Sequence, residues 1–152
     1  MASITERLEL VGAAAVVLSL VFVALEIRHS TNTAASQAVF ELNEAARETQ
    51  FIVATDPDLV ELIFQAEADL ESLTDQQYYR YRSWVFSTQN LFESAWTHHQ
   101  RGVISDDEMN GWASAYCNYM SIDSYRAMVG TIDTNASGFM LAASSWCDRP
   151  IG

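Results

Sequence analysis

Two adjacent histidines and one glutamate are the residues whose chemistry could extend to metal binding or acid–base catalysis. Glu93 precedes His98 and His99 in a segment of helical pattern. Metal ligands on a helix lie three or four residues apart, and neighbouring helical residues point about 100° apart, so the spacing does not suit a metal. It favours histidines that stabilise the carbonyl end of a helix dipole. We expect Glu93 to be paired with Arg82 or Arg101.

The run from Asp106 to Gly111 is similar to the start of a calcium-binding loop. An EF-hand needs a bidentate glutamate at its twelfth position, which Cys117 occupies here. Ser105 and Glu108 instead have the S-x-x-E spacing of a capping box. The segment therefore predicts a helix start, and we expect no metal site.

Nucleophilic and redox chemistry have equally little support. Cys117 and Cys147 match no zinc pattern and are too few for a disulfide framework. Buried free thiols are the expected state, with a single disulfide as the alternative if the domain faces an oxidising compartment. The sequence has no G-x-S-x-G, no glycine-rich phosphate loop and no S-x-x-K. We predict no enzyme and no cofactor; an enzyme that uses Glu93 and His99 is the last alternative.

Acidic residues dominate the charge of the chain. Twenty Asp and Glu face eight Arg and no Lys, for a net charge of −12. Between Glu41 and Asp75, ten carboxylates are accompanied by Arg47 alone. Such a surface repels phosphate backbones, which excludes nucleic acid as a partner. We interpret it as a solvated face, with a basic partner or a divalent cation as the alternative.

The element that organises the chain is an apolar stretch of sixteen uncharged residues, Leu10 to Leu25. Ser3 and Glu6 have capping-box spacing, which predicts a helix start near Ile4. The stretch rises about 24 Å, and flanking residues extend it towards the roughly 30 Å of a bilayer core. We interpret residues 1–30 as a membrane-anchor helix. A signal peptide and a buried helix of a soluble oligomer are the alternatives.

Small residues follow one face of this anchor. At spacings of three and four, the stripe consists of Gly12, Ala15, Ser19, Val23 and Glu26. Small side chains let transmembrane helices approach closely, so the first four predict a helix-packing interface. Glu26 is the candidate ion or proton site, because ionisable groups in membranes are costly and commonly functional.

Residues 31–152 predict an acidic all-helical domain. An apolar periodicity of three and four continues to Ile52, and this helix is either continuous with the anchor or separate from it. Asp56, followed by proline, predicts the start of a second helix. Thr74 opens the longest one, which Gly102 ends.

Three shorter helical segments complete the chain. One begins after Ser105 and ends near Tyr119, and Ser121 is the expected cap of the next, which reaches Val129. A weaker helical pattern extends to Cys147. The predicted fold class is all-α, a single N-terminal transmembrane helix followed by a small helical bundle.

Three motifs in this order resemble those of a widespread family of small, functionally uncharacterised bacterial proteins. They are the junction LEIRHSTN at Leu25–Asn32, the helix FESAWTHH at Phe92–His99 and the turn GVISDDE at Gly102–Glu108. The resemblance implies an N-terminal membrane helix with an all-helical soluble domain. It implies no catalytic residues.

From these patterns we predict a single-pass protein of the bacterial inner membrane with a cytoplasmic C-terminal domain. Its function is non-enzymatic: it self-associates, or it is an accessory subunit of a larger membrane complex. Its partners are then membrane lipid and either further copies of itself or other membrane-protein subunits. The alternative is a homo-oligomer that conducts ions or protons, with Glu26 on the pathway.

Overall fold

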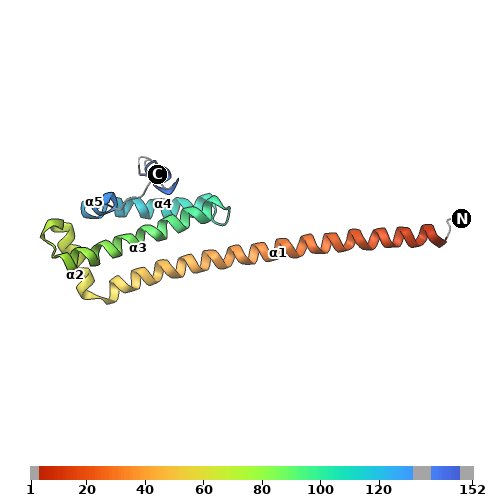
Figure 1. The fold of residues 1–152 in the computed structure, drawn as a ribbon, viewed down its shortest axis with the longest axis horizontal. Helices are drawn as coiled ribbons and strands as arrows, with labels where there is room; N and C mark the ends of the chain where they lie inside the picture. Colours follow the sequence, from red (N-terminus) through yellow and green to blue (C-terminus); the bar gives the residue numbers. More distant parts are fainter. Residues whose placement is uncertain (1–3, 132–137, 148–152) are drawn as a thin grey trace. The chain divides into compact units, whose positions relative to one another are not determined.

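The computed structural model describes residues 4–131 and 138–147, with side chains described from Gly12 onward. Every regular element in this part of the chain is helical, which confirms the all-α class. The elements are α1 (Ile4–Thr55), α2 (Pro57–Ala68), a 3₁₀ turn (Leu70–Ser72), α3 (Asp75–Gln100), α4 (Asp106–Met120), α5 (Asp123–Thr131) and α6 (Gly138–Ala143), shown in Figure 1.

Helix α1 crosses the boundary between two compact units, Met1–Gln37 and Ala38–Gly152. It begins at Ile4 as predicted, although its expected cap, Ser3, lies outside the described residues. The weak helix formers after residue 29 do not end it. Thr31 donates its hydroxyl hydrogen to the carbonyl of Ile27 at 2.8 Å, so this polar group is satisfied within the helix. The structure thus favours continuity over two separate helices.

The predicted helix starts are confirmed by their hydrogen bonds. The Asp56 carboxylate accepts a bond from the Leu59 N–H at 3.0 Å, directly before the proline that opens α2. Thr74 and Gln77 form a complete capping box before α3. Ser105 and Glu108 form another before α4. The acidic run there is therefore the first turn of a helix.

Gly102 ends α3 through a conformation that favours glycine. Its φ angle is 71°, and its N–H donates to the carbonyl of His99 at 2.8 Å. The N–H of Val103 donates to the carbonyl of His98 at 2.9 Å. These two bonds form a Schellman motif, which satisfies carbonyls that the helix end would leave free.

Ser121 has a different role from the predicted one. It is the C-cap of α4, and its hydroxyl donates to the carbonyl of Asn118 at 2.7 Å. Helix α5 begins only at Asp123. The prediction that Ser121 caps the following helix is wrong because the short connection uses this residue to finish α4 instead.

The first part of the core lies between α2, α3 and α5. Its two largest fully buried side chains, Tyr81 and Tyr125, satisfy their hydroxyls internally: Tyr81 pairs with Ser124 at 2.9 Å and Tyr125 with Thr88 at 2.7 Å. Burial raises the pKa of both phenols. The buried members of this cluster are Leu59, Leu62, Ala66, Tyr81, Val85, Tyr125, Met128 and Val129.

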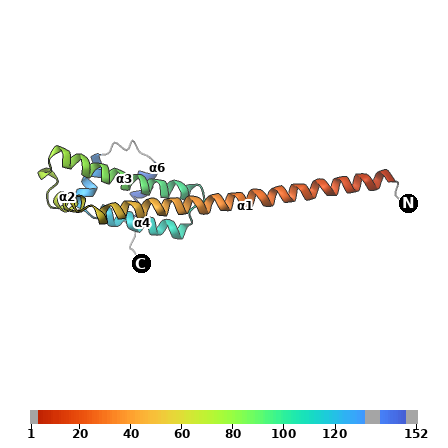
Figure 2. The ribbon, with the colours of Figure 1, turned by 90° about the horizontal axis from the view of Figure 1, so that it is seen from below.

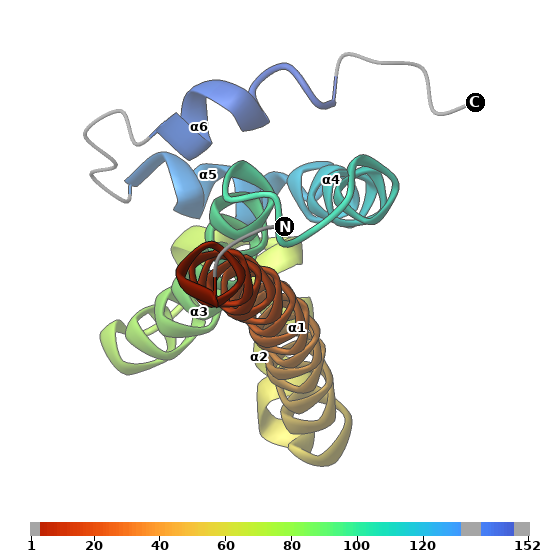
Figure 3. The same ribbon diagram turned by 90° about the vertical axis from the view of Figure 1, so that its right-hand side faces the viewer.

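The second part of the core surrounds the C-terminal half of α3. Helix α3 packs against α2, α4, α5 and α6. The last three lie on the same side of α3 in Figure 3, and Figure 2 shows α6 beside α3. Aromatic rings fill this side, with Phe92 and Tyr116 in an edge contact at 5.3 Å between centroids. The buried members are Leu42, Phe92, Ala95, Ile104, Met109, Tyr116, Phe139 and Ala143.

Candidate functional site

The apolar part of α1 has no cover from the described protein. An eighteen-residue window of this helix is long and apolar enough to cross a membrane and is 0% buried. Its large side chains are between 50% exposed, at Val23, and 69% exposed, at Leu18. A soluble core helix buries such side chains, whereas a lipid-facing helix leaves them outside the protein.

The predicted stripe lies on this exposed part of the helix. Gly12, Ala15, Ser19 and Val23 are all exposed, and a Cβ added at Gly12 would meet nothing within 4 Å. The hydroxyl of Ser19 donates to the carbonyl of Ala15 at 2.8 Å. The stripe therefore offers a smooth surface without an unsatisfied donor, which suits close helix approach.

Glu26 is exposed at the end of the same unit. It forms no ion pair with Arg28, His29 or any other described residue. Within the described chain nothing neutralises its carboxylate, so its role as an ion or proton site stays a prediction.

The histidines lie where their spacing places them, in the last turn of α3. His99 Nδ1 lies 3.1 Å from the carbonyl oxygen of Ile104, and its Nε2 lies 3.6 Å from a carboxylate oxygen of Asp106. A carbonyl only accepts, so Nδ1 carries the hydrogen of this bond. In the described part of the chain, no three His, Cys, Asp or Glu side chains gather as metal ligands.

Glu93 departs from the prediction. Its side chain is half-buried, and among the described residues it forms no ion pair with Arg82, Arg101 or any other cation. The expected pairing is therefore wrong. Partial exposure explains it, since a carboxylate that still reaches water needs no buried partner.

A groove of about 850 Å³ lies beside His99. Three segments form its walls: the last turns of α3, one face of α4, and the end of α6 with the chain after it. Spacings of three and four put the α4 residues on a single helical face. The lining residues are Trp96, His99, Gln100, Asp106, Met109, Asn110, Ala113, Ser114, Cys117, Ala142, Ser145, Trp146 and Cys147.

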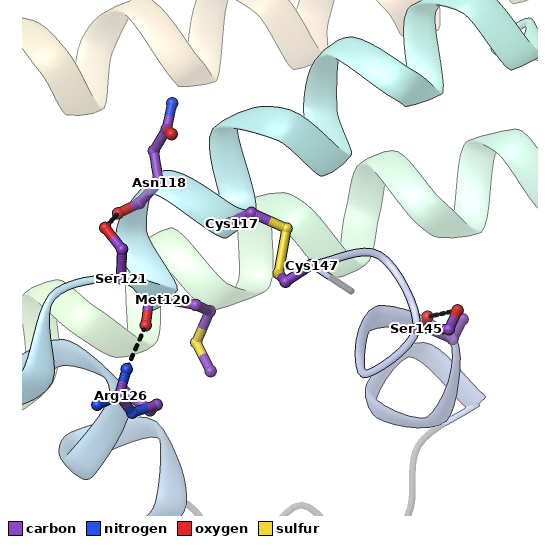
Figure 4. Close-up of a disulfide and its surroundings, with 8 residues drawn as sticks. Cys117, Asn118, Met120, Ser121, Arg126, Ser145 and Cys147 are labelled. Carbon is purple, nitrogen blue, oxygen red and sulfur yellow. Dashed lines mark hydrogen bonds between the residues drawn. A yellow bond between two sulfur atoms is a disulfide. The ribbon is translucent and has the colours of Figure 1, made fainter. Parts of the chain in front are cut away.

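A disulfide fixes the C-terminal wall of this groove. Cys117 on α4 is bonded to Cys147, and their Cα atoms are 5.3 Å apart (Figure 4). The expectation of free thiols is wrong because α6 and the chain after it return to α4. Thirty residues separate the two cysteines, and spacing alone could not show that they meet.

Glycine lets α6 approach the same wall closely. A Cβ added at Gly138 would lie 2.9 Å from the indole ring of Trp96. Phe139 then contacts both groove-lining indoles, with its ring centroid 6.3 Å from that of Trp96 and 5.7 Å from that of Trp146. The groove thus has aromatic walls held by a close helix contact and a covalent bond.

Sequence reasoning missed this groove. The sequence pattern indicates His99 and Cys117 as chemical groups, but it gives no sign that tryptophans lie beside them. The available signal was the combination of two tryptophans, two cysteines and small residues such as Ala113 and Ala142, which leave space between large side chains. These residues come together only because the last segment folds back onto α3 and α4. The local sequence pattern does not show that return.

Comparison with known proteins found no matching family model, no similar curated protein and no similar solved structure. The function must therefore be argued from the chain's own residues.

Proposed function

We propose that this protein is a membrane-anchored, non-enzymatic protein that acts by self-association or as an accessory subunit of a membrane complex. The observation that carries the proposal is the apolar part of α1, whose large side chains are uniformly exposed. Leaving these side chains in water is unfavourable, because burying each one gains about 1.5–3 kcal/mol. Lipid removes that cost without any further protein.

Continuity of α1 supports an anchor over a cleaved signal peptide. The same helix that contains the apolar segment reaches Thr55, and Leu42 on it is buried in the core of the domain. Signal peptides have an apolar region of about 7–15 residues and end at a small-residue cleavage site. Here the apolar segment runs on into a helix that contributes to the folded domain.

The stripe of Gly12, Ala15, Ser19 and Val23 supports association within the membrane. In lipid, helices associate by close packing rather than by the hydrophobic effect, so small side chains on one face favour contact there. The partner helix on this account belongs to a second copy or to another membrane subunit.

The disulfide favours a domain outside the cytoplasm. Disulfides persist in oxidising compartments and are rare where thioredoxin and glutathione keep thiols reduced. Cys117 and Cys147 are bonded, so we place the C-terminal domain on the oxidising face of the bacterial inner membrane. This replaces the cytoplasmic orientation expected from the sequence, where Arg7 and Arg28 balance each other across the span.

Crosslinking in native membranes tests self-association. Replacing Gly12, Ala15 and Ser19 together by Leu is expected to abolish the crosslinked species, because the bulky side chains separate the helices. The matched control places Leu at Ala14, Val17 and Val21, which lie on the opposite helical face. Equal crosslinking of both variants and the native protein would contradict the proposed interface.

Orientation has its own test. A membrane-impermeant maleimide applied to intact spheroplasts after mild reduction is expected to label Cys117 and Cys147. Without reduction, labelling should be absent, because both thiols are in the disulfide. Labelling that appears only after the membrane is broken would place the domain in the cytoplasm.

A further inference from the structure

We propose that the groove between α3, α4 and the disulfide-bonded C-terminal segment binds a small organic cation with a quaternary or tertiary ammonium group. Its volume of about 850 Å³ is within the roughly 300–1,000 Å³ typical of small-molecule sites. The site lies entirely in the helical domain, and the proposal is independent of what the anchor contacts.

The charges of the groove favour a cation. Among the described lining residues, Asp106 is anionic at neutral pH and none is an arginine. The chain has no lysine and a net charge of −12. Its field therefore attracts cations and repels anions.

Polar side chains of the lining add hydrogen-bonding groups. His99 donates from Nδ1 to the carbonyl of Ile104, and its Nε2 lies 3.6 Å from a carboxylate oxygen of Asp106. Asn110 and Ser114 add an amide and a hydroxyl from the same face of α4. Such a set accepts hydrogen bonds from a cationic or hydroxylated ligand.

Aromatic rings supply the second element of cation recognition. The faces of indole rings attract ammonium groups more strongly than those of tyrosine or phenylalanine. Trp96 and Trp146 both line the groove and are half-buried. Met109, which is 6% exposed, adds an apolar base.

The disulfide prepares the site before a ligand arrives. Cys147 directly follows Trp146, and its bond to Cys117 ties this part of the chain to α4 (Figure 4). Trp146 contacts Tyr116 of α4, with 5.6 Å between ring centroids. A site formed in advance loses less conformational freedom on binding. The bond thus contributes to recognition by positioning one aromatic wall.

Choline and its neutral isostere 3,3-dimethylbutan-1-ol distinguish a cation site from an apolar cleft. The full-length protein in nanodiscs of phosphatidylglycerol is titrated, and the indole N–H signals are followed by NMR. Choline should shift the signals of Trp96 and Trp146 and leave Trp84, in the other part of the core, unchanged. The isostere should bind at least about tenfold more weakly.

Two variants locate the interaction. Asp106→Asn should weaken choline binding about threefold, whereas Asp107→Asn, which removes the neighbouring charge outside the groove, should leave it unchanged. Trp146→Leu should weaken it about three- to tenfold, with Trp96 as the remaining reporter.

Nanodiscs that contain phosphatidylcholine separate the two sources of the ligand. Shifts of Trp96 and Trp146 there without free choline identify a lipid headgroup, and shifts only with free choline identify a soluble cation.

Several results would overturn the proposal. Equal affinity for choline and the isostere would show an apolar cleft without charge selection. Equal effects of Asp106→Asn and Asp107→Asn on choline affinity would show that the Asp106 carboxylate does not contact the ligand. No shift of Trp96 or Trp146 with choline or phosphatidylcholine would show that the groove does not bind such cations.

Discussion

Residues 12–27 and the helices described between residues 38 and 147 place their apolar side chains differently. In the first region every large apolar side chain is exposed. In the second, buried side chains gather in three clusters, and Leu42 joins one of them from α1 itself. A single helix thus carries an all-round apolar segment and a segment with one buried face. The difference shows that composition alone does not determine burial, whereas the pattern around the helix does.

Hydroxyl groups in both regions find partners inside the protein. Ser19 satisfies its hydroxyl by donating to the backbone carbonyl of Ala15. In the domain core, Tyr81 and Tyr125 pair with side-chain hydroxyls instead. The core is not satisfied throughout, because the indole N–H of Trp84 is buried without a hydrogen-bond partner among the described residues.

Arginines in the apolar segment should have the largest effect. Leu18→Arg with Val21→Arg adds about 5–7 kcal/mol to the free energy of membrane insertion, at about 2.5–3.5 kcal/mol for each central arginine. We expect the double variant to leave the membrane pellet on alkaline carbonate extraction, while the native protein remains there. This result would separate the apolar segment from the domain directly.

The matched control for that variant is Phe40→Arg with Phe51→Arg. Both phenylalanines are exposed, at 63% and 66%, and lie on the domain part of α1. They should tolerate arginine without loss of membrane attachment. If the Leu18 and Val21 variant also stayed in the pellet, the apolar segment would not be what attaches the protein to the membrane.

Removal of the disulfide should affect only the domain. Replacing Cys117 and Cys147 together by Ser lowers the free energy of unfolding of the domain by about 2–4 kcal/mol, because the unfolded chain regains the freedom that the closed loop removes. Denaturant unfolding followed by tryptophan fluorescence measures this change. Membrane attachment should be unaltered, and reduction of the native protein should reproduce the loss. A reductant without effect on the unfolding midpoint would contradict a stabilising disulfide.

Helix starts and ends were predictable because they depend on local chemistry. Asp56, Thr74 and Ser105 accept bonds from N–H groups within three residues, and Gly102 adopts a backbone conformation that few other residues tolerate. The exposed apolar segment followed in the same way from a continuous run of residue types.

Tertiary placement explains what the sequence did not reveal. Ser121 could finish one helix or begin the next, and the length of the connection decided this. The disulfide and the groove depend on the return of α6 to α3 and α4, over a separation of thirty residues between the cysteines. The prediction that Glu93 pairs with an arginine was wrong, because the local sequence pattern does not show how far this side chain is exposed to water.

Gly138→Ala tests the close approach that shapes the groove. Its Cβ would lie 2.9 Å from the Trp96 indole, so relief of the overlap should cost about 1–3 kcal/mol of domain stability. Gly111→Ala is the matched control, since a Cβ there meets nothing within 4 Å and lies inside α4. It should stabilise the domain by up to about 1 kcal/mol. Thermal unfolding of both variants measures this difference in domain stability. Equal stabilisation by the two substitutions would show that Gly138 is not needed for the close contact with Trp96.

The smallest expected effect is the dependence of domain stability on acid. The backbone N–H of Leu59 lowers the pKa of Asp56, as does Arg80, and the Ser105 backbone lowers the pKa of Glu108. Both carboxylates have a lower pKa in the folded than in the unfolded chain. Their contribution to domain stability is therefore complete above their pKa values in the unfolded chain, about 4–4.5. It is lost as the pH falls through their lower pKa values in the folded chain.

Asp56→Asn with Glu108→Gln retains groups that can cap but removes their titration. Thermal unfolding between pH 5 and pH 3 should therefore vary less with pH in this double variant than in the native protein. Asp107→Asn is the control, because that carboxylate accepts no cap hydrogen bond within the described residues. Membrane attachment should show no such dependence, since the apolar segment has no carboxylate between Leu10 and Leu25. An unchanged slope in the double variant would mean that the two caps do not carry the acid sensitivity of the domain.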